Sequence, residues 1–97
     1  MERMIIVAGR IYVAPGTRAQ FLEDSRAGTK DARLARGCRE FVVAADPLEP
    51  DRVNIYEEWD SAADLTLFRG DGPTAALTVS IIRMDVTRHQ VTSSVPA

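Results

Sequence analysis

The stretch CREFVVAADPLEPDRVNIYEEW, residues 38–59, decides the fold of this chain. Two runs rich in β-branched and aromatic residues, 38–45 and 52–59, lie on either side of residues 46–51 (DPLEPD). Proline and aspartate favour turns, whereas valine, isoleucine and aromatic residues favour strands. The stretch therefore predicts two antiparallel strands that form a hairpin.

A strand and a long helix are predicted before the hairpin. Residues 4–13 (MIIVAGRIYV) are mostly apolar and β-branched, which predicts a first strand. Helix-forming residues then run to Arg36, with Thr17 at the N-cap position and Gly37 at the C-cap. Glycine costs roughly 1 kcal/mol relative to alanine inside a helix, so we expect a bend or a break at Gly28.

A short helix is predicted directly after the hairpin. Asp60 and Ser61 are good N-cap residues, and a helix over residues 62–69 would turn Leu65 and Phe68 inward. The run Gly70-Asp-Gly-Pro73 then ends it.

A last strand is predicted over residues 83–92. The segment 74–82 alternates like extended chain and then changes phase, which indicates a bulge near residues 81–82 or two separate pieces. We expect residues 1–92 to form one domain and residues 93–97 a flexible tail.

The predicted order is strand, helix, strand, strand, helix, strand. This order is typical of the ferredoxin-like βαββαβ fold, an α+β architecture with one antiparallel sheet and both helices on one face. Both faces of the first and second strands are nevertheless apolar, so the face without helices would expose an apolar patch. We therefore expect a homodimer in which a second copy covers that face, sheet against sheet. In the first strand one face carries Met4, Ile6, Ala8 and Tyr12, and the other carries Ile5, Val7, Ile11 and Val13.

The composition is that of one small soluble domain. The chain has 97 residues, of which 45% are hydrophobic and 27% charged, with a net charge of −2. Neither a clustered basic surface nor an apolar run of ~20 residues is present, so we expect no binding to nucleic acid or membranes. Without a signal peptide the default location is the cytoplasm. Cys38 is the single cysteine, and we interpret it as a packed structural thiol.

Five arginines gather in and after the long helix. Acidic residues lie among them, so the stripe is either a solvated face of mixed charge or an anion-binding face, and we favour the first interpretation. The arginines are Arg18, Arg26, Arg33, Arg36 and Arg39, and the acids are Glu23, Asp24, Asp31 and Glu40.

Few side chains can carry chemistry. Trp59 ends the third strand, where it either plugs the core or forms the wall of a pocket. Asn54 and Tyr56 share the other face of that strand and could hydrogen-bond a polar aromatic ligand. His89, on the last strand, is either a proton shuttle or a surface or interface histidine.

Glu57 and Glu58 are adjacent on the third strand, so they point to opposite faces and cannot act as a catalytic pair. We expect one of them to be buried against an arginine such as Arg10 or Arg83, or to face solvent.

Taken in order, these segments resemble the antibiotic biosynthesis monooxygenase family. The resemblance spans residues 4–91, and Tyr56-Glu57-Glu58-Trp59-Asp60-Ser61 after a hairpin is its most specific part. It implies a ferredoxin-like unit that dimerises into a shared α/β barrel. It also implies oxidation by molecular oxygen of a small aromatic, quinol or polyketide-like substrate, with no metal or flavin cofactor.

The resemblance transfers few residues. Trp59 matches a family tryptophan that lines the pocket in several members, and Asn54 is a candidate partner, although their spacing puts them on opposite faces. Many members have a histidine after the short helix. Residues 67–70 (LFRG) contain none, which disfavours a haem-degrading activity.

Three functions are consistent with this sequence. The first is a cofactor-independent monooxygenase, with Trp59, His89, Asn54 and Tyr56 as catalytic candidates. The second is a non-catalytic dimeric small-molecule-binding or stress-response module, and the third is an accessory subunit of a larger enzyme. An enclosed apolar pocket holding Trp59 and a titratable group would favour an enzyme, and a filled space would favour a module without catalysis.

Overall fold

A computed structural model describes residues 2–70 and 81–97 of the chain. Within these residues the elements follow the predicted βαββαβ order, which confirms the ferredoxin-like α+β fold. They are β1 (Ile5–Val13), α1 (Arg18–Leu34), β2 (Cys38–Ala45), β3 (Arg52–Trp59), α2 (Ala62–Arg69) and β4 (Ile81–Gln90).

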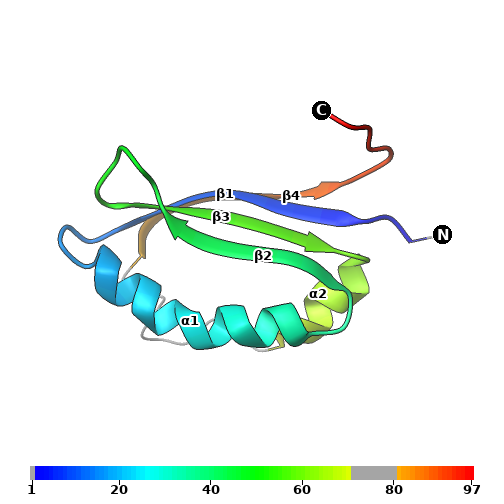
Figure 1. Ribbon diagram of the computed structural model, residues 1–97, viewed down its shortest axis with the longest axis horizontal. Helices are drawn as coiled ribbons and strands as arrows, with labels where there is room; N and C mark the ends of the chain where they lie inside the picture. Colours follow the sequence, from blue (N-terminus) through cyan, green and yellow to red (C-terminus); the bar gives the residue numbers. More distant parts are fainter. Residues whose placement is uncertain (1, 71–80) are drawn as a thin grey trace.

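The strands form one antiparallel sheet with the order β2-β3-β1-β4. The predicted hairpin is its β2–β3 pair, in which Val43 lies opposite Ile55. Figure 1 shows α1 and α2 on the same side of this sheet, with α1 running along β2. In the part of the chain that is described, no helix is long and apolar enough to span a membrane.

The core lies between the sheet and the helices, on what we call the helix face. It consists of two clusters of buried side chains, and every strand contributes to the surrounding contacts. One cluster joins Ile5, Val7, Trp59 and Leu65, and the other joins Ile11, Val13, Phe21 and Val53. Side chains of this size each stabilise the fold by about 1.5–3 kcal/mol when fully buried, so these eight supply most of the driving force.

The opposite side of the sheet, the open face, is covered by no helix among the described residues (Figure 1). Ala8 lies opposite Tyr56 and Thr87, and Tyr56 lies opposite Val42, so one apolar row crosses the middle of this face. The rows on either side of it are mostly charged and polar, although they also contain Ile6 and Ala44. The open face is therefore an apolar band within a polar frame, narrower than the apolar patch that the sequence predicts.

Helix α1 differs from the prediction in its middle and at its end. It is a single helix of 17 residues that passes through Gly28 without a break. It ends at Leu34 with Ala35 as the C-cap, and Gly37, at φ +82°, makes the turn into β2. Thr17 occupies the predicted N-cap position, but its hydroxyl donates to the carbonyl oxygen of Ala14 instead of capping the helix.

The predicted bulge is present at the start of β4. Tyr12 pairs with Arg83, but Val13 pairs with Ile81, so Ile82 is the extra residue. The bulge allows β4 to begin at Ile81 and end at Gln90, two residues earlier at each end than predicted. The expectation for residues 74–80 lies outside the described part, and residues 91–97 contain neither helix nor strand.

Gly9 and Gly28 make a matched pair for a stability measurement. Gly9 lies at φ +153°, and a Cβ atom there would overlap the carbonyl oxygen of Asp85 and lie 2.7 Å from the Cα of Val86. A Cβ at Gly28 meets nothing within 4 Å. We expect Gly9→Ala to lower the free energy of unfolding by about 3 kcal/mol, through strain and overlap. Gly28→Ala should raise it by up to about 1 kcal/mol.

Urea denaturation at one fixed chain concentration measures both changes. Equal effects of the two substitutions would show that the close approach of β1 to β4 is not what requires glycine at position 9.

Candidate functional site

Trp59 is the last residue of β3 and lies on the helix face, where it is fully buried. Its ring packs on Phe68 of α2 with 5.3 Å between centroids, and Phe68 also contacts Phe41 of β2. The N-cap of α2 positions Phe68, because the Ser61 hydroxyl accepts a hydrogen bond of 3.1 Å from the backbone N–H of Asp64. Trp59 therefore joins sheet to helix, as the core interpretation predicts.

Glu57 lies two residues before Trp59 and so points to the same face of β3. Its side chain accepts a hydrogen bond of 2.9 Å from the Trp59 indole N–H, and the residue is only 7% exposed. The expectation of burial against Arg10 or Arg83 is wrong. Those two arginines lie on the open face and contact Asp85 instead. An indole, which carries no charge, is the hydrogen-bond partner of this buried carboxylate.

Burial raises the pKa of Glu57 above its ordinary value, because the charged form loses hydration. The Trp59 hydrogen bond and the positive charges of Arg69 and Arg88 act in the opposite direction and are weaker. A carboxylate with a raised pKa is a stronger base than one in water. Glu57 is therefore a better proton acceptor than a solvated carboxylate.

The strands place Glu57 in a row of side chains across the helix face. Phe41 lies opposite Glu57 on one side, Val7 lies opposite it on the other, and Arg88 follows beyond Val7. Directly opposed residues share a face of the sheet. Arg88 and Met84, both on β4, are exposed, Met84 to 60%. Val7, which is buried, lies between Glu57 and Arg88 in this row.

Cys38 borders the same cluster, opposite Trp59. Burial first, and then the charges of Glu57 and Glu40, raise the pKa of its thiol. The thiol is therefore protonated near neutral pH, which agrees with a packed structural cysteine and not with a nucleophile.

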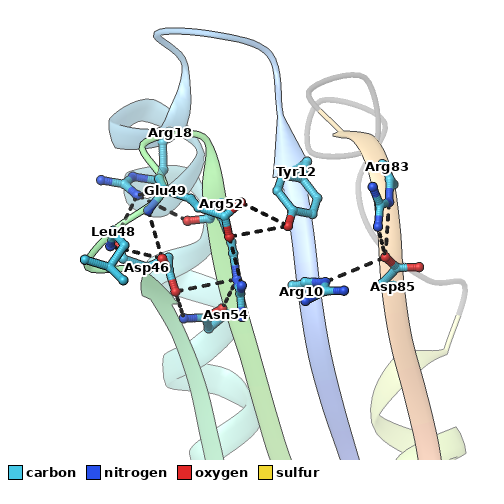
Figure 2. A network of polar contacts seen from close by, with 10 residues as sticks. All are labelled: Arg10, Tyr12, Arg18, Asp46, Leu48, Glu49, Arg52, Asn54, Arg83 and Asp85. Carbon is cyan, nitrogen blue, oxygen red and sulfur yellow. Dashed lines mark hydrogen bonds and ion pairs between the residues drawn. The ribbon is translucent and has the colours of Figure 1, made fainter.

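Asn54 lies on the open face, as its five-residue separation from Trp59 predicts. Its amide donates to the Asp46 carboxylate at 2.9 Å and its carbonyl oxygen accepts from the Arg52 guanidinium at 2.8 Å. Figure 2 shows these groups at the end of the sheet where the hairpin turns, together with Glu49 and Tyr12. Asn54 therefore holds the turn, and no contact joins it to Trp59.

Two further ion pairs, which share the Asp85 carboxylate, lie at the same end of the sheet on β1 and β4. Arg10 and Arg83 both reach the Asp85 carboxylate, and the Arg83 guanidinium lies 5.1 Å from the centre of the Tyr12 ring (Figure 2). These charges are exposed or half-buried and satisfy one another.

Tyr56 and His89 also lie on the open face. The Tyr56 hydroxyl donates to Glu58 at 2.8 Å, and this hydrogen bond is the main reason that the pKa of Tyr56 is raised. His89 is exposed and lies across from Ile6. Of the four predicted site residues, the structure thus separates Trp59 from the other three. Glu57 is the site residue that sequence reasoning missed, although its Glu-x-Trp spacing already places it beside Trp59.

Two hollows of the described part of the chain are not lined by Trp59. One of 260 Å³ is lined by Glu2, Arg3, Ile5, Ala62 and Gln90, and one of 400 Å³ lies between α1 and β2. Neither is lined by Glu57 or by any of the four predicted residues. Among the described residues, no group of three or more His, Cys, Asp or Glu side chains could hold a metal ion.

Comparisons with known proteins agree on the family and the fold. The family model described as antibiotic biosynthesis monooxygenase matches residues 4–73. A search of the curated proteins returned no match. A Chloroflexus aurantiacus protein described as a "putative Antibiotic biosynthesis monooxygenase" superposes with a TM-score of 0.77 at 23% identity, covering 96% of this chain and 97% of its own.

Two further structures have the same fold. A Caulobacter crescentus protein with the same description has a TM-score of 0.81 at 17% identity, over 95% of this chain and 92% of its own. A Bacteroides thetaiotaomicron conserved protein of unknown function has a TM-score of 0.80 at 17% identity, over 94% and 100%.

The Asn54 network predicts a pH dependence of stability. The pKa of Asp46 is lowered to about 2, first by the Asn54 hydrogen bond and then by the backbone N–H groups of Glu49 and Leu48. A pKa below the ordinary 3.8 stabilises the fold above that value, and the stabilisation is lost as the pH falls towards 2. In Asn54→Ala we expect the pKa of Asp46 to rise and the acid loss of stability to shrink.

Carboxyl NMR titration and urea denaturation across this pH range measure the two effects. Gln20→Ala is the control, because Gln20 donates a hydrogen bond of similar length, 2.7 Å, to the exposed Asp24. An unchanged Asp46 titration in Asn54→Ala would contradict the assigned role of the amide.

Proposed function

The chain belongs to the antibiotic biosynthesis monooxygenase family, and from this we propose that it is a monooxygenase that works without metal or flavin. Its substrate is a small aromatic compound, either a quinol or a polyketide-like anthrone, and its oxidant is molecular oxygen. The observation that carries this proposal is the buried Glu57 carboxylate, hydrogen-bonded to Trp59 inside an apolar cluster.

Deprotonation is the step for which a protein base matters most. A neutral anthrone or quinol transfers electrons to oxygen poorly, whereas its anion is electron-rich. A base with a raised pKa in an apolar setting matches this task, because it accepts the proton without a competing hydration shell. Glu57 has both properties.

The reaction balances for an anthrone without any other reductant. Glu57 takes one proton from the CH₂ group, and the carbanion gives its electrons to O₂ to form a C–O bond and a peroxide anion. The protonated Glu57 returns the proton to the peroxide. Loss of the second C–H proton and cleavage of the O–O bond then yield the ketone and one water, so one oxygen atom enters the product and the other leaves as water.

Trp59 acts in this scheme as a positioning residue. Its indole N–H fixes one carboxylate oxygen of Glu57 at 2.9 Å, and its ring is held in turn by Phe68. The apolar side chains of Phe41 and Val7 adjoin Glu57 on either side and suit an aromatic ring.

A non-catalytic module remains the second candidate, and one observation favours it. Trp59 is fully buried, and neither hollow described above holds it. If no ligand can enter the space around Trp59, the chain acts as a binding or stress-response module, or as an accessory subunit of a larger enzyme.

We also propose that the chain is a homodimer. The apolar row of Val42, Tyr56 and Ala8 crosses the open face without a helix over it, and a second copy can cover it sheet against sheet. Closure in this way would make the shared α/β barrel.

Oxygen uptake with hydroquinones and anthrones, without added metal or flavin, tests the proposed activity. We expect uptake above the spontaneous rate and a loss of about 10²–10⁴-fold in Glu57→Gln, which keeps the shape but cannot accept the proton. Glu58→Gln is the matched control, since Glu58 is adjacent but lies on the open face. Uptake at the spontaneous rate by the wild-type chain would favour the non-catalytic module.

The pH profile provides a separate test of Glu57. A base must be ionised to act, so kcat/KM should rise with pH through the raised pKa of Glu57. The same raised pKa has the opposite effect on stability: the free energy of unfolding should fall as the pH rises through it, because the folded state holds the proton more tightly. Glu57→Gln should remove this dependence of stability. A rate limb and a stability slope that both persist in Glu57→Gln would exclude Glu57 as the titrating group.

Sedimentation at micromolar concentration tests the dimer. We expect a species of twice the 10.7 kDa chain mass, and a shift to the monomer in Val42→Lys, which buries a charge in the apolar row. Leu67→Lys is the control, because Leu67 on α2 is 71% exposed and lies away from the open face. A wild-type chain that sediments as a monomer would contradict the proposal.

A further inference from the structure

A groove of 400 Å³ is lined by residues of α1 and by Val43 of β2. Strand β2 is at the edge of the sheet, and α1 runs along it (Figure 1). Its lining includes the apolar residues Leu22, Leu34 and Val43 and the cations Arg26, Lys30 and Arg33. Among the described residues, no aspartate or glutamate lines this groove. It thus combines three positive charges with apolar surface, outside the proposed active site.

Positive and negative residues alternate along the sequence of α1, but the cations of the groove lie on one side of the helix. Successive residues of an α-helix turn by about 100°, so positions 26, 30 and 33 fall within one narrow sector. Asp24 and Asp31 fall on the far side of the helix from this sector. The cations at the groove are therefore not neutralised by these two acids.

Most of the other arginines in the same stretch have structural roles. Arg18 donates to the carbonyl oxygens of Asp46, Glu49 and Arg52, and so holds the hairpin turn to α1. Arg39 pairs with Asp60 of the turn before α2. Of the three cations at the groove, Arg26 forms an exposed pair with Glu23 at 3.6 Å, and such a pair contributes little.

The apolar part of the groove is exposed enough to bind a partner. Leu34 is 79% exposed, while Leu22 and Val43 are half-buried. The groove thus offers apolar contacts from these three side chains next to its positive charges.

The edge of β2 argues against a partner that adds a strand to the sheet. The Phe41 carbonyl oxygen accepts from the Arg33 guanidinium at 2.9 Å, and the Phe41 N–H donates to the Glu40 carboxylate at 3.1 Å. Side chains thus occupy backbone groups that strand addition would need. A helix laid along α1 needs none of them.

We propose that this groove docks an acidic amphipathic helix of another protein. The apolar residues of the helix would contact Leu22, Leu34 and Val43, and its carboxylates would face Arg26, Lys30 and Arg33. This surface is independent of Glu57, so it operates whether or not the chain is an oxygenase.

Fluorescence anisotropy with a labelled synthetic peptide tests the proposal. The probe is an amphipathic helix of about 18 residues with leucine on one face and glutamate beside it, compared with a lysine version of the same pattern. We expect the acidic peptide to bind, to bind less tightly at high ionic strength, and to lose about tenfold in affinity in the Arg26→Gln, Lys30→Gln double variant.

Arg36→Gln is the matched control, since its side chain is 85% exposed and points to Asp64, away from the groove. It should leave the affinity unchanged. Binding that survives the double variant, equal binding of the lysine peptide, or no binding at about 1 mM would overturn the proposal. One further outcome would overturn it: the peptide does not bind, the wild-type chain binds anionic phospholipid vesicles, and the double variant loses that binding.

Discussion

Both helices of this chain lie on the same side of a four-stranded sheet, so a single copy can bury only one face of that sheet. The placement of the candidate site residues depends on this constraint. Along each strand the side chains alternate, and every residue is thereby assigned either to the core or to the open face. Trp59 and Glu57 go to the core, whereas Asn54, Tyr56 and His89 go to the open face. The chemistry of the two faces is therefore separate within one chain.

Burial of the Glu57 carboxylate lowers the stability of the fold, so its presence in the core needs an explanation. Removal of a carboxylate from water costs several kcal/mol, and an apolar side chain of similar volume in the same place is often as stable or better. One indole hydrogen bond offsets only part of that cost, as the raised pKa of Glu57 shows. Perturbed carboxyl groups of this kind concentrate at functional sites. The position of Glu57 is thus not explained by the stability of the fold, and it agrees with the proposed role in proton transfer.

The sequence was sufficient for the element order, because alternation, turn residues and the Ser61 cap are local signals. It was sufficient for the bulge at Ile82, where the phase of the apolar residues changes. It was insufficient at Gly28, where tertiary packing of α1 outweighs a local propensity cost of roughly 1 kcal/mol. The hydrogen-bond partner of Glu57 could not be predicted either. The expectation that a buried acid pairs with an arginine leaves out the indole of a tryptophan two residues away. Asn54 looked catalytic because no local signal shows that Asp46 folds back onto it.

The polar frame of the open face is compatible with its coverage by a second copy. A charged group that enters an interface is costly when it is left without a partner. Here Asp46 already has Asn54 and Arg52, and Asp85 already has Arg10 and Arg83. These pairs can approach a second sheet with their charges matched within the chain, and the adjacent apolar row of Val42, Tyr56 and Ala8 supplies the attraction. Of the cations along α1 that line the groove, Arg26 has a carboxylate partner only in the exposed Glu23, among the described residues. For this reason the polar groups of the open face suit a partner of the same kind, whereas those of the groove suit a partner of opposite charge.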